Sequence, residues 1–197
     1  GNVTNTITTP LINISDNIHA INNNALRLGT GVNNINANAI NVAGVSGAGR
    51  RGGGIINFNA AGGVGVTTIR NQAGAGPSVL NIGVNSANTG AIITGNVDLR
   101  GHEVDAQFSA INIGVNAGGA TGNGPTTYDH SFSFDNGTLV VSGAVTVGQK
   151  TSTSANSNQV NTVNIGGGNV TIGSVVLANH TSSAGVVNGT LNISGGI

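Results

Sequence analysis

The chain has 197 residues, a formal net charge of zero at pH 7 and a pI of about 7.1, with 34 glycines and 31 asparagines but only 6% charged and 3% aromatic residues. Because ordinary soluble domains carry about 25% charged residues, this composition excludes an average enzyme, and its 38% apolar content excludes a disordered chain. The basic residues are scattered, no long apolar run occurs and there is no cysteine, so we expect no nucleic-acid partner, no membrane-spanning helix and no disulfide or thiolate chemistry.

The first third of the chain carries two apolar patterns. The stretch Val3–Ser15 alternates and is rich in Thr and Ile, which predicts a strand available for donation to a second copy. From Ser15 to Leu28 the apolar residues recur at helical spacing behind a Ser15-Asp16 cap, but Asn22–Asn24 are poor helix formers. A short N-terminal helix and a further strand are both left open here. The residues of the stripe are Ile14, Ile18, Ile21, Ala25 and Leu28.

A glycine-rich string follows at Arg50–Gly54 and predicts a loop or a flexible turn. We place a boundary after it. Residues 1–54 are predicted to form an N-terminal cap or assembly segment, and residues 55–197 a repetitive β domain.

Short segments with a two-residue apolar period fill the chain from residue 80 onward, which is typical of half-buried strands. Gly, Asn or Ser ends nearly every segment, and Asn-Gly pairs at Asn123, Asn136 and Asn188 supply corners with positive φ. The alternating residues are Leu80, Ile82 and Val84; Val97 and Leu99; Ile111, Ile113 and Val115; Leu139 and Val141; Val145 and Val147; Val163 and Ile165; Val170 and Ile172; and Leu191 and Ile193.

Two sequence motifs repeat within these segments. LNIGVN at Leu80–Asn85 returns as INIGVN at Ile111–Asn116, 31 residues later, and VNIGGG follows at Val163–Gly168. DNGTLVVSG at Asp135–Gly143 returns as VNGTLNISG at Val187–Gly195. Both motifs share an offset of 52 residues, as from Asn112 to Asn164 and from Gly137 to Gly189, which indicates a structural period.

Short strands, frequent corners and repeats predict an all-β chain, a β-solenoid or a related repetitive β-sandwich. The offset of 52 residues is then two or three coils, and the spacing of 31 reflects loops of differing length, with Gly118–His130 as the best protruding loop. We expect stacked Val, Ile, Leu and Ala with Asn ladders in the interior, and no need for large rings.

The NGTLxxSG strands that end in Gly, in a background of Asn, Gly, Val, Ile and Thr, resemble the passenger regions of bacterial autotransporters, most of all the rickettsial surface-antigen group. The resemblance covers residues 80–197 best, with Ile92–Gly101 and Gly137–Gly143 as the nearest segments. It implies a β-helical passenger at the bacterial cell surface, in adhesion or in a surface layer. No translocating barrel is recognisable in these residues, and the chain begins at Gly1, so we expect a cleaved or excised passenger or a small relative.

The densest charged stretch is DLRGHEVD, which contains Asp98, Glu103 and Asp105. Paired carboxylates would suit a carbohydrate-active β-helix enzyme, but a solvated turn explains the stretch as well, and we predict no catalytic residue. We expect no cofactor. A structural calcium ion at Asp98, Glu103 and Asp105, or at Asp129 and Asp135, is the alternative that the residue types allow.

The histidines are far apart in the sequence and do not follow the spacing of a metal-binding motif, so we expect ordinary surface histidines. They are His19, His102, His130 and His180.

Three hypotheses of function remain. The first is a non-catalytic extracellular module of the passenger or adhesin type, whose partner is a receptor or glycan on a host or neighbouring cell. The second is a self-assembling filament, sheath or surface-layer subunit joined to copies of itself through strand edges. The third is the carbohydrate-active enzyme.

Overall fold

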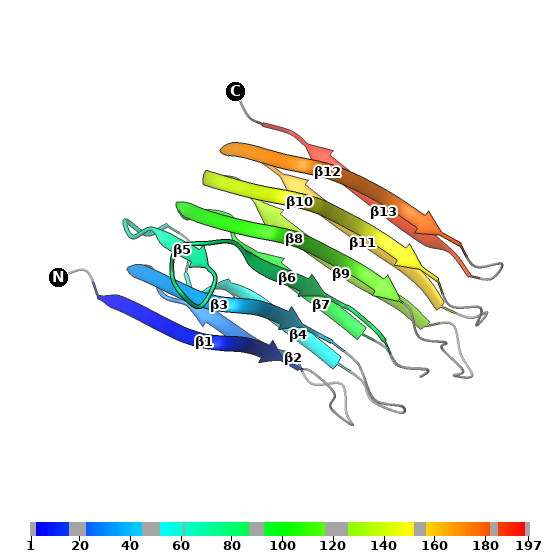
Figure 1. Cartoon of the computed structure of the whole chain (residues 1–197), viewed down its shortest axis with the longest axis horizontal. Coiled ribbons are helices and arrows are strands. Elements are labelled where there is room, and N and C mark those ends of the chain that lie inside the picture. Colours follow the sequence, from blue (N-terminus) through cyan, green and yellow to red (C-terminus); the bar gives the residue numbers. More distant parts are fainter. Residues whose placement is uncertain are drawn as a thin grey trace.

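The structure is a computed structural model that describes residues 3–15, 23–44, 52–60, 62–86, 93–116, 126–151, 157–181 and 185–195. The chain is all-β, and its parallel strands form a β-solenoid of about five turns, which confirms the predicted fold class. Figure 1 shows the coils side by side, with the two termini at opposite ends of the stack.

Two parallel sheets make up the solenoid, and each coil contributes to both. Sheet I runs in the order β1-β3-β5-β8-β10-β12, with β6 also paired to β3 and β8. Its strands are β1 (Thr4–Ile14), β3 (Val32–Val42), β5 (Thr67–Arg70), β6 (Ser78–Ile82), β8 (Val104–Asn116), β10 (Gly137–Lys150) and β12 (Asn169–His180). Sheet II runs in the order β13-β11-β9-β7-β4-β2. Its strands are β2 (Asn23–Leu28), β4 (Gly52–Phe58), β7 (Ile93–Asp98), β9 (Thr126–Phe134), β11 (Ser157–Ile165) and β13 (Val187–Ile193).

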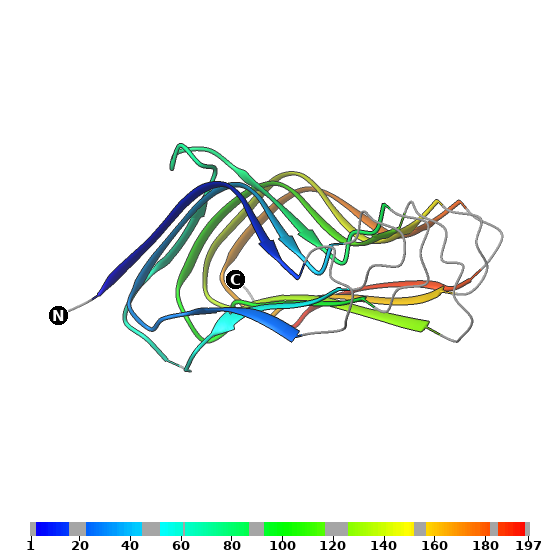
Figure 2. The same cartoon turned by 90° about the horizontal axis from the view of Figure 1, so that it is seen from below.

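Sheet I is bent, so each long strand has two arms (Figure 2). The pairing register shifts at the bend, between Val141 and Ala144 of β10. In one coil the two arms are separate strands, because the segment Asn71–Pro77 is inserted between β5 and β6. The two arms and sheet II therefore give the solenoid three faces.

The insertion is a small ordered loop that the sequence analysis did not single out. Within the loop, the main-chain N–H of Gly76 donates to the side-chain oxygen of Asn71 at 3.2 Å. The main-chain N–H of Gln72 donates to the side-chain oxygen of Asn38 in β3 at 3.1 Å. The loop predicted to protrude at Gly118–His130 lies outside the described residues up to residue 125, and Thr126–His130 belongs to β9.

Apolar side chains fill the interior in columns that run through successive coils. One column contains Ile14, Val42, Ile82, Ile113, Val147 and Leu177, joined by in-register pairing from β1 to β12. Aromatic rings also lie in this interior, contrary to our expectation: Phe108, Tyr128, Phe132 and Phe134 are each buried. Small residues such as Ala37 and Ala106 are buried in the same interior.

The N-terminal segment and its boundary can now be placed. Asn23–Leu28 forms β2, so the helix left open for this stretch is wrong over these residues, and residues 16–22 lie outside the described part. Gly52–Gly54 also forms strand rather than a loop, because β4 pairs with β2 and β7 on its two sides. The boundary expected at residue 54 thus lies inside β4.

The two repeat spacings correspond to other numbers of coils than we predicted. The 31-residue spacing is one coil, because Leu80 of β6 pairs with Ile111 of β8. The 52-residue offset is about one and a half coils, since Asn112 lies in sheet I and Asn164 in sheet II. The prediction of two or three coils is therefore wrong, and the motif copies occupy opposite sheets.

A stack of left-handed residues marks the corner at which each coil leaves sheet I. Its members are in register from coil to coil: Ser15, Ala43, Gly83, Gly114, Gly148 and Ala178, all with positive φ. Sheet II approaches this corner so closely that glycine stands on at least one side of each close contact. Gly54 lies against Ala43, and Gly189 against Ala178, whereas His130 packs on Gly83 and Asn161 on Gly114.

Candidate functional site

The carboxylates predicted to bind calcium or a sugar lie on different parts of the coil. Asp98 ends β7 in sheet II, Asp105 lies in β8 of sheet I, and Glu103 is exposed between them. The main-chain oxygen of Glu103 accepts a hydrogen bond from the amide of Thr67 at 2.9 Å. In the described part of the chain no three His, Cys, Asp or Glu residues are grouped so that they could hold a metal ion.

Two of these carboxylates are paired with arginines. Arg100 donates from Nε to Asp98 Oδ1 at 2.8 Å and from a terminal nitrogen to Oδ2 at 2.7 Å, and these bonds lower the pKa of Asp98. Arg70 binds the Asp105 carboxylate at 2.5 Å and the Asp105 main-chain oxygen at 2.7 Å. Each of these two acids therefore has its own cation: the Arg70–Asp105 pair joins successive coils, and the Arg100–Asp98 pair is local to one turn.

The second carboxylate pair is also divided. Asp129 is exposed on β9, whereas Asp135 lies at the turn after β9 and accepts the amide N–H of Gly101 at 2.9 Å. Asp135 thereby connects two successive turns of the solenoid.

Two of the four histidines are interior residues rather than the surface residues we expected. His102 is 2% exposed, and its ring stacks on that of Phe58 with the ring centres 3.8 Å apart. The Nε2 atom of His102 is hydrogen-bonded to the main-chain oxygen of Ala60 at 2.7 Å. His130 is also buried, and its Nδ1 accepts the amide N–H of Gly95 at 3.1 Å. His180 is exposed, and His19 lies outside the described residues.

Burial lowers the pKa of His130 to about 3, so this ring is neutral in the folded protein at neutral pH. Its neutral form is required by the bond from Gly95, because Nδ1 must be unprotonated to accept. His130 is therefore a structural residue of the coil corner.

Lys150, the single lysine, is also in the interior. It ends β10, where it pairs in register with Asn116 of β8 and His180 of β12, and its side chain is inaccessible. Desolvation lowers the pKa of its amino group. Asp129 of β9 is exposed, while its neighbours Tyr128 and His130 are buried, so the β9 carboxylate does not share the interior with Lys150.

An asparagine ladder follows the outside of sheet I across four coils. Asn41 donates to Asn13 at 2.8 Å, Asn81 to Asn41 at 2.9 Å and Asn112 to Asn81 at 2.8 Å. These side chains are exposed or half-buried, so this ladder lies on the surface, whereas the interior that we predicted for such ladders holds buried asparagines such as Asn33, Asn85 and Asn116. The signal was present as the recurring Asn-Ile or Asn-Val pair in four strands, but alternation alone does not say which face is buried.

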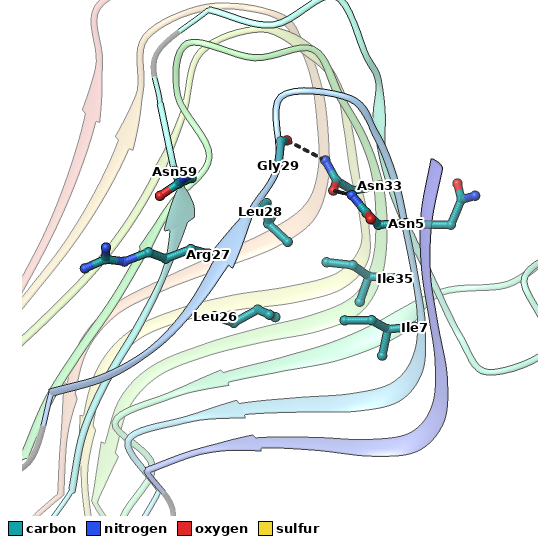
Figure 3. Close-up of a pocket in the computed structure, with 10 residues that line it drawn as sticks. Asn5, Ile7, Leu26, Arg27, Leu28, Gly29, Asn33, Ile35 and Asn59 are labelled. Atoms are coloured by element: carbon teal, nitrogen blue, oxygen red, sulfur yellow. Dashed lines mark hydrogen bonds between the residues drawn. The ribbon is translucent and has the colours of Figure 1, made fainter. Parts of the chain in front are cut away.

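Two hollows lie at the opposite ends of the solenoid, where the core meets the surface. The first, of about 490 Å³, lies at the N-terminal coil and is lined by residues that include Ile7, Leu26, Leu28 and Ile35. In Figure 3 Leu26 and Leu28 of β2 face Ile7 and Ile35, whereas Arg27 points away from the hollow. The second, of about 250 Å³, lies at the last coil. Its lining residues are Ile165, Gly168, Val170, Ile172, Leu191, Ile193 and Gly195.

Comparison with protein-family models, with curated proteins and with solved structures found no match. The described residues contain no helix with the length and apolarity that a bilayer crossing requires.

Proposed function

We propose that the chain is a non-catalytic extracellular module, a rigid β-solenoid of the surface-passenger type, which binds a neutral glycan on a neighbouring cell through the asparagine ladder. The observation that carries the proposal is the ladder itself, a row of four amides in register on one face of sheet I.

The chemistry of the ladder suits hydroxyl groups. The two inner amides, Asn41 and Asn81, each use one N–H and one oxygen lone pair on their ladder neighbours, which leaves a second donor and a second acceptor for a ligand. Because the neighbouring amides already hold Asn41 and Asn81 in place, little side-chain entropy is lost on binding. The strands below repeat at the usual spacing of about 4.8 Å, so the donors and acceptors form a regular array.

The pairing of the acidic residues supports a role without catalysis. Asp98 and Asp105 are held by Arg100 and Arg70 on different sheets, so neither is positioned opposite the other across a shared substrate. The resemblance of the NGTLxxSG strands to autotransporter passengers supports the location at a cell surface.

The test measures binding of the fluorescently labelled chain to immobilised neutral glycans and to intact cells. Asn81→Asp removes the bond that Asn81 donates to Asn41 and places a charge at the centre of the array, so we expect binding to fall at least tenfold, on the order of 1.4 kcal/mol. The matched control is Asn164→Asp, because Asn164 forms a similar outer pair with Asn192 at 2.8 Å, but on sheet II.

The wild-type affinity should also persist when salt is raised to about 0.5 M, since the array carries no charge to be screened. Equal loss in both variants, binding that disappears with salt, or no binding to any glycan or cell would each contradict the proposal.

A further inference from the structure

The solenoid exposes its core at both ends. In the last coil Val175 is 41% exposed, Leu177 46% and Ile193 70%, although these residues continue columns that are buried in the preceding coils. At the first coil Ile7 and Leu26 line the larger hollow. Among the described residues, β1 and β2 have no strand partner on their outer side, and neither do β12 and β13.

The two ends match each other position by position. Strand register connects Ile7 to Val170 through Ile35, Ile69, Ala106 and Leu139 in one column. In the same way Ile12 corresponds to Val175, and Ile14 to Leu177.

Sheet II shows the same correspondence. Leu26 is connected by register to Leu191 through Ile56, Val97, Phe132 and Val163. These four core-facing positions are therefore apolar at both ends, so the first coil carries apolar side chains where a coil that followed the last one would need them.

From this match we infer that the C-terminal coil of one copy receives the N-terminal coil of a second copy, so that the solenoid continues from chain to chain as a head-to-tail filament. Val170 of one copy then stacks on Ile7 of the next, Leu177 on Ile14 and Leu191 on Leu26. The joint buries apolar side chains that are exposed in the single chain, which provides its driving force.

Strand direction fixes the polarity of the joint. All paired strands of both sheets are parallel, so β12 and β1 point the same way and can pair as β10 pairs with β12. A head-to-head contact reverses one set of strands and loses this register. Because the two contacting surfaces differ, the contact is open and does not close after two copies.

The edges lack the charged residues that often prevent such pairing. β1 and β12 contain no Lys, Arg, Asp or Glu, whereas soluble proteins often protect edges with charge. Pro10 of β1 does not interrupt the pairing with β3, because Thr9 and Leu11 on its two sides pair in one register with Ala37 and Ala39. Asn34 donates to Thr6 at 3.4 Å within the chain, and Asn169 occupies the equivalent position on the incoming β12.

The inference is independent of glycan binding and has its own test. Sedimentation velocity and negative-stain electron microscopy of the pure chain over rising concentration should show growth from monomers to unbranched filaments. Leu177→Asp with Ile193→Asp should leave a folded monomer by circular dichroism, because both side chains are already exposed. The matched control is Val64→Asp, which also removes an exposed apolar side chain, 86% exposed, but in the connection between β4 and β5.

Polarity is tested by cross-linking, since the chain contains no cysteine. Asn13 and Val176 occupy equivalent outward positions of the first and last coils. A short bis-thiol reagent should link Asn13→Cys/Val176→Cys chains into long oligomers and should leave each single variant uncross-linked. A monomer at every concentration, filaments that persist in the Leu177→Asp/Ile193→Asp variant, or dimers from either single variant would overturn the inference.

Discussion

The middle coils and the end coils contain the same pattern of residues but differ in burial. Val147 of β10 is inaccessible, whereas Leu177, the next member of its column in β12, is 46% exposed. Ile165 of β11 is 5% exposed and Ile193, which follows it in β13, is 70% exposed. All four residues are aliphatic and the members of each pair are in register, so the presence of a further coil on the outer side decides whether a side chain is core.

This difference teaches that stability in a solenoid comes from contacts between neighbouring coils. A coil in the middle has two neighbours and a coil at the end has one. Substitutions at equivalent positions should therefore have large effects in the middle and small effects at the ends, which gives matched pairs of variants across the chain.

The largest difference in stability is expected between two aspartate variants in the column that contains Val147 and Leu177. Val147→Asp buries an unpaired carboxylate between two coils and should cost more than about 4 kcal/mol, enough to remove the folded state. Leu177→Asp should cost about 1 kcal/mol or less in the monomer, because its side chain already contacts water. Urea unfolding followed by circular dichroism measures both, and similar losses in the two variants would contradict the account.

The second largest loss of stability is expected from a substitution at the corner of residues with positive φ. Gly114 has φ of 61° and faces the Asn161 amide, so Gly114→Ala should destabilise the fold by about 2–3 kcal/mol through overlap at the corner. Ala43 and Ala178 tolerate the same conformation because Gly54 and Gly189 lie opposite them.

A second substitution on the facing strand sharpens this prediction. Gly114→Ala/Asn161→Gly reproduces the arrangement at Ala43 and should recover part of the lost free energy of unfolding. A double-mutant cycle measures the coupling, and strictly additive losses would show that size matching across the corner plays no part.

Acid should weaken the middle of the solenoid through His130. Its pKa is lowered from 6.5 to about 3 in the folded chain, so unfolding takes up a proton in the pH range between these values. The stability is fully present above pH 6.5 and falls as pH decreases, by up to about 1.4 kcal/mol per pH unit, or about 2 kcal/mol near pH 5.

The control for this pH dependence comes from the neighbouring coil. His130→Asn places at this position the residue that Asn161 supplies one coil later, and it should flatten the slope. The measurement is best kept above about pH 5, since the lowered pKa of Asp98 adds a loss of stability only at more acidic pH. An unchanged slope in His130→Asn would assign the acid sensitivity to another group.

The smallest contrast is expected in the asparagine ladder. Asn81 forms ladder bonds on both sides, at 2.9 and 2.8 Å, and Asn81→Ala should cost about 1 kcal/mol. Asn13 at the end of the ladder accepts one bond from Asn41 at 2.8 Å, so Asn13→Ala should cost about half as much. Thermal unfolding resolves the two, and a larger loss for Asn13→Ala would reverse the expected order.

The sequence predicts the strands and the solenoid because both depend on local signals. Alternation at Ile111, Ile113 and Val115 and glycine at positive-φ corners can be recognised without knowing what packs where. The coil length is harder to predict, because the copies of NGTL at Gly137 and Gly189 resemble each other and yet lie in opposite sheets.

The parts that the sequence does not predict depend on neighbouring coils. Ser15, Ala43 and Ala178 adopt positive φ although they are not glycine, because their register with Gly83 and Gly114 places them at the same corner. Burial of His130 and the pairing of Asp105 with Arg70 likewise depend on segments 35 residues apart that only the fold brings together. Inter-coil register is the missing information in each case.

Hydrogen exchange at several protein concentrations tests most directly that the exposed ends are completed by another copy. At low concentration the amides of β1, β12 and β13 should exchange rapidly while those of β8 and β10 stay protected, because only the middle strands are paired on both sides. At high concentration the end strands should become protected to a degree approaching the middle strands. End strands that exchange at the same rate at every concentration would contradict the account.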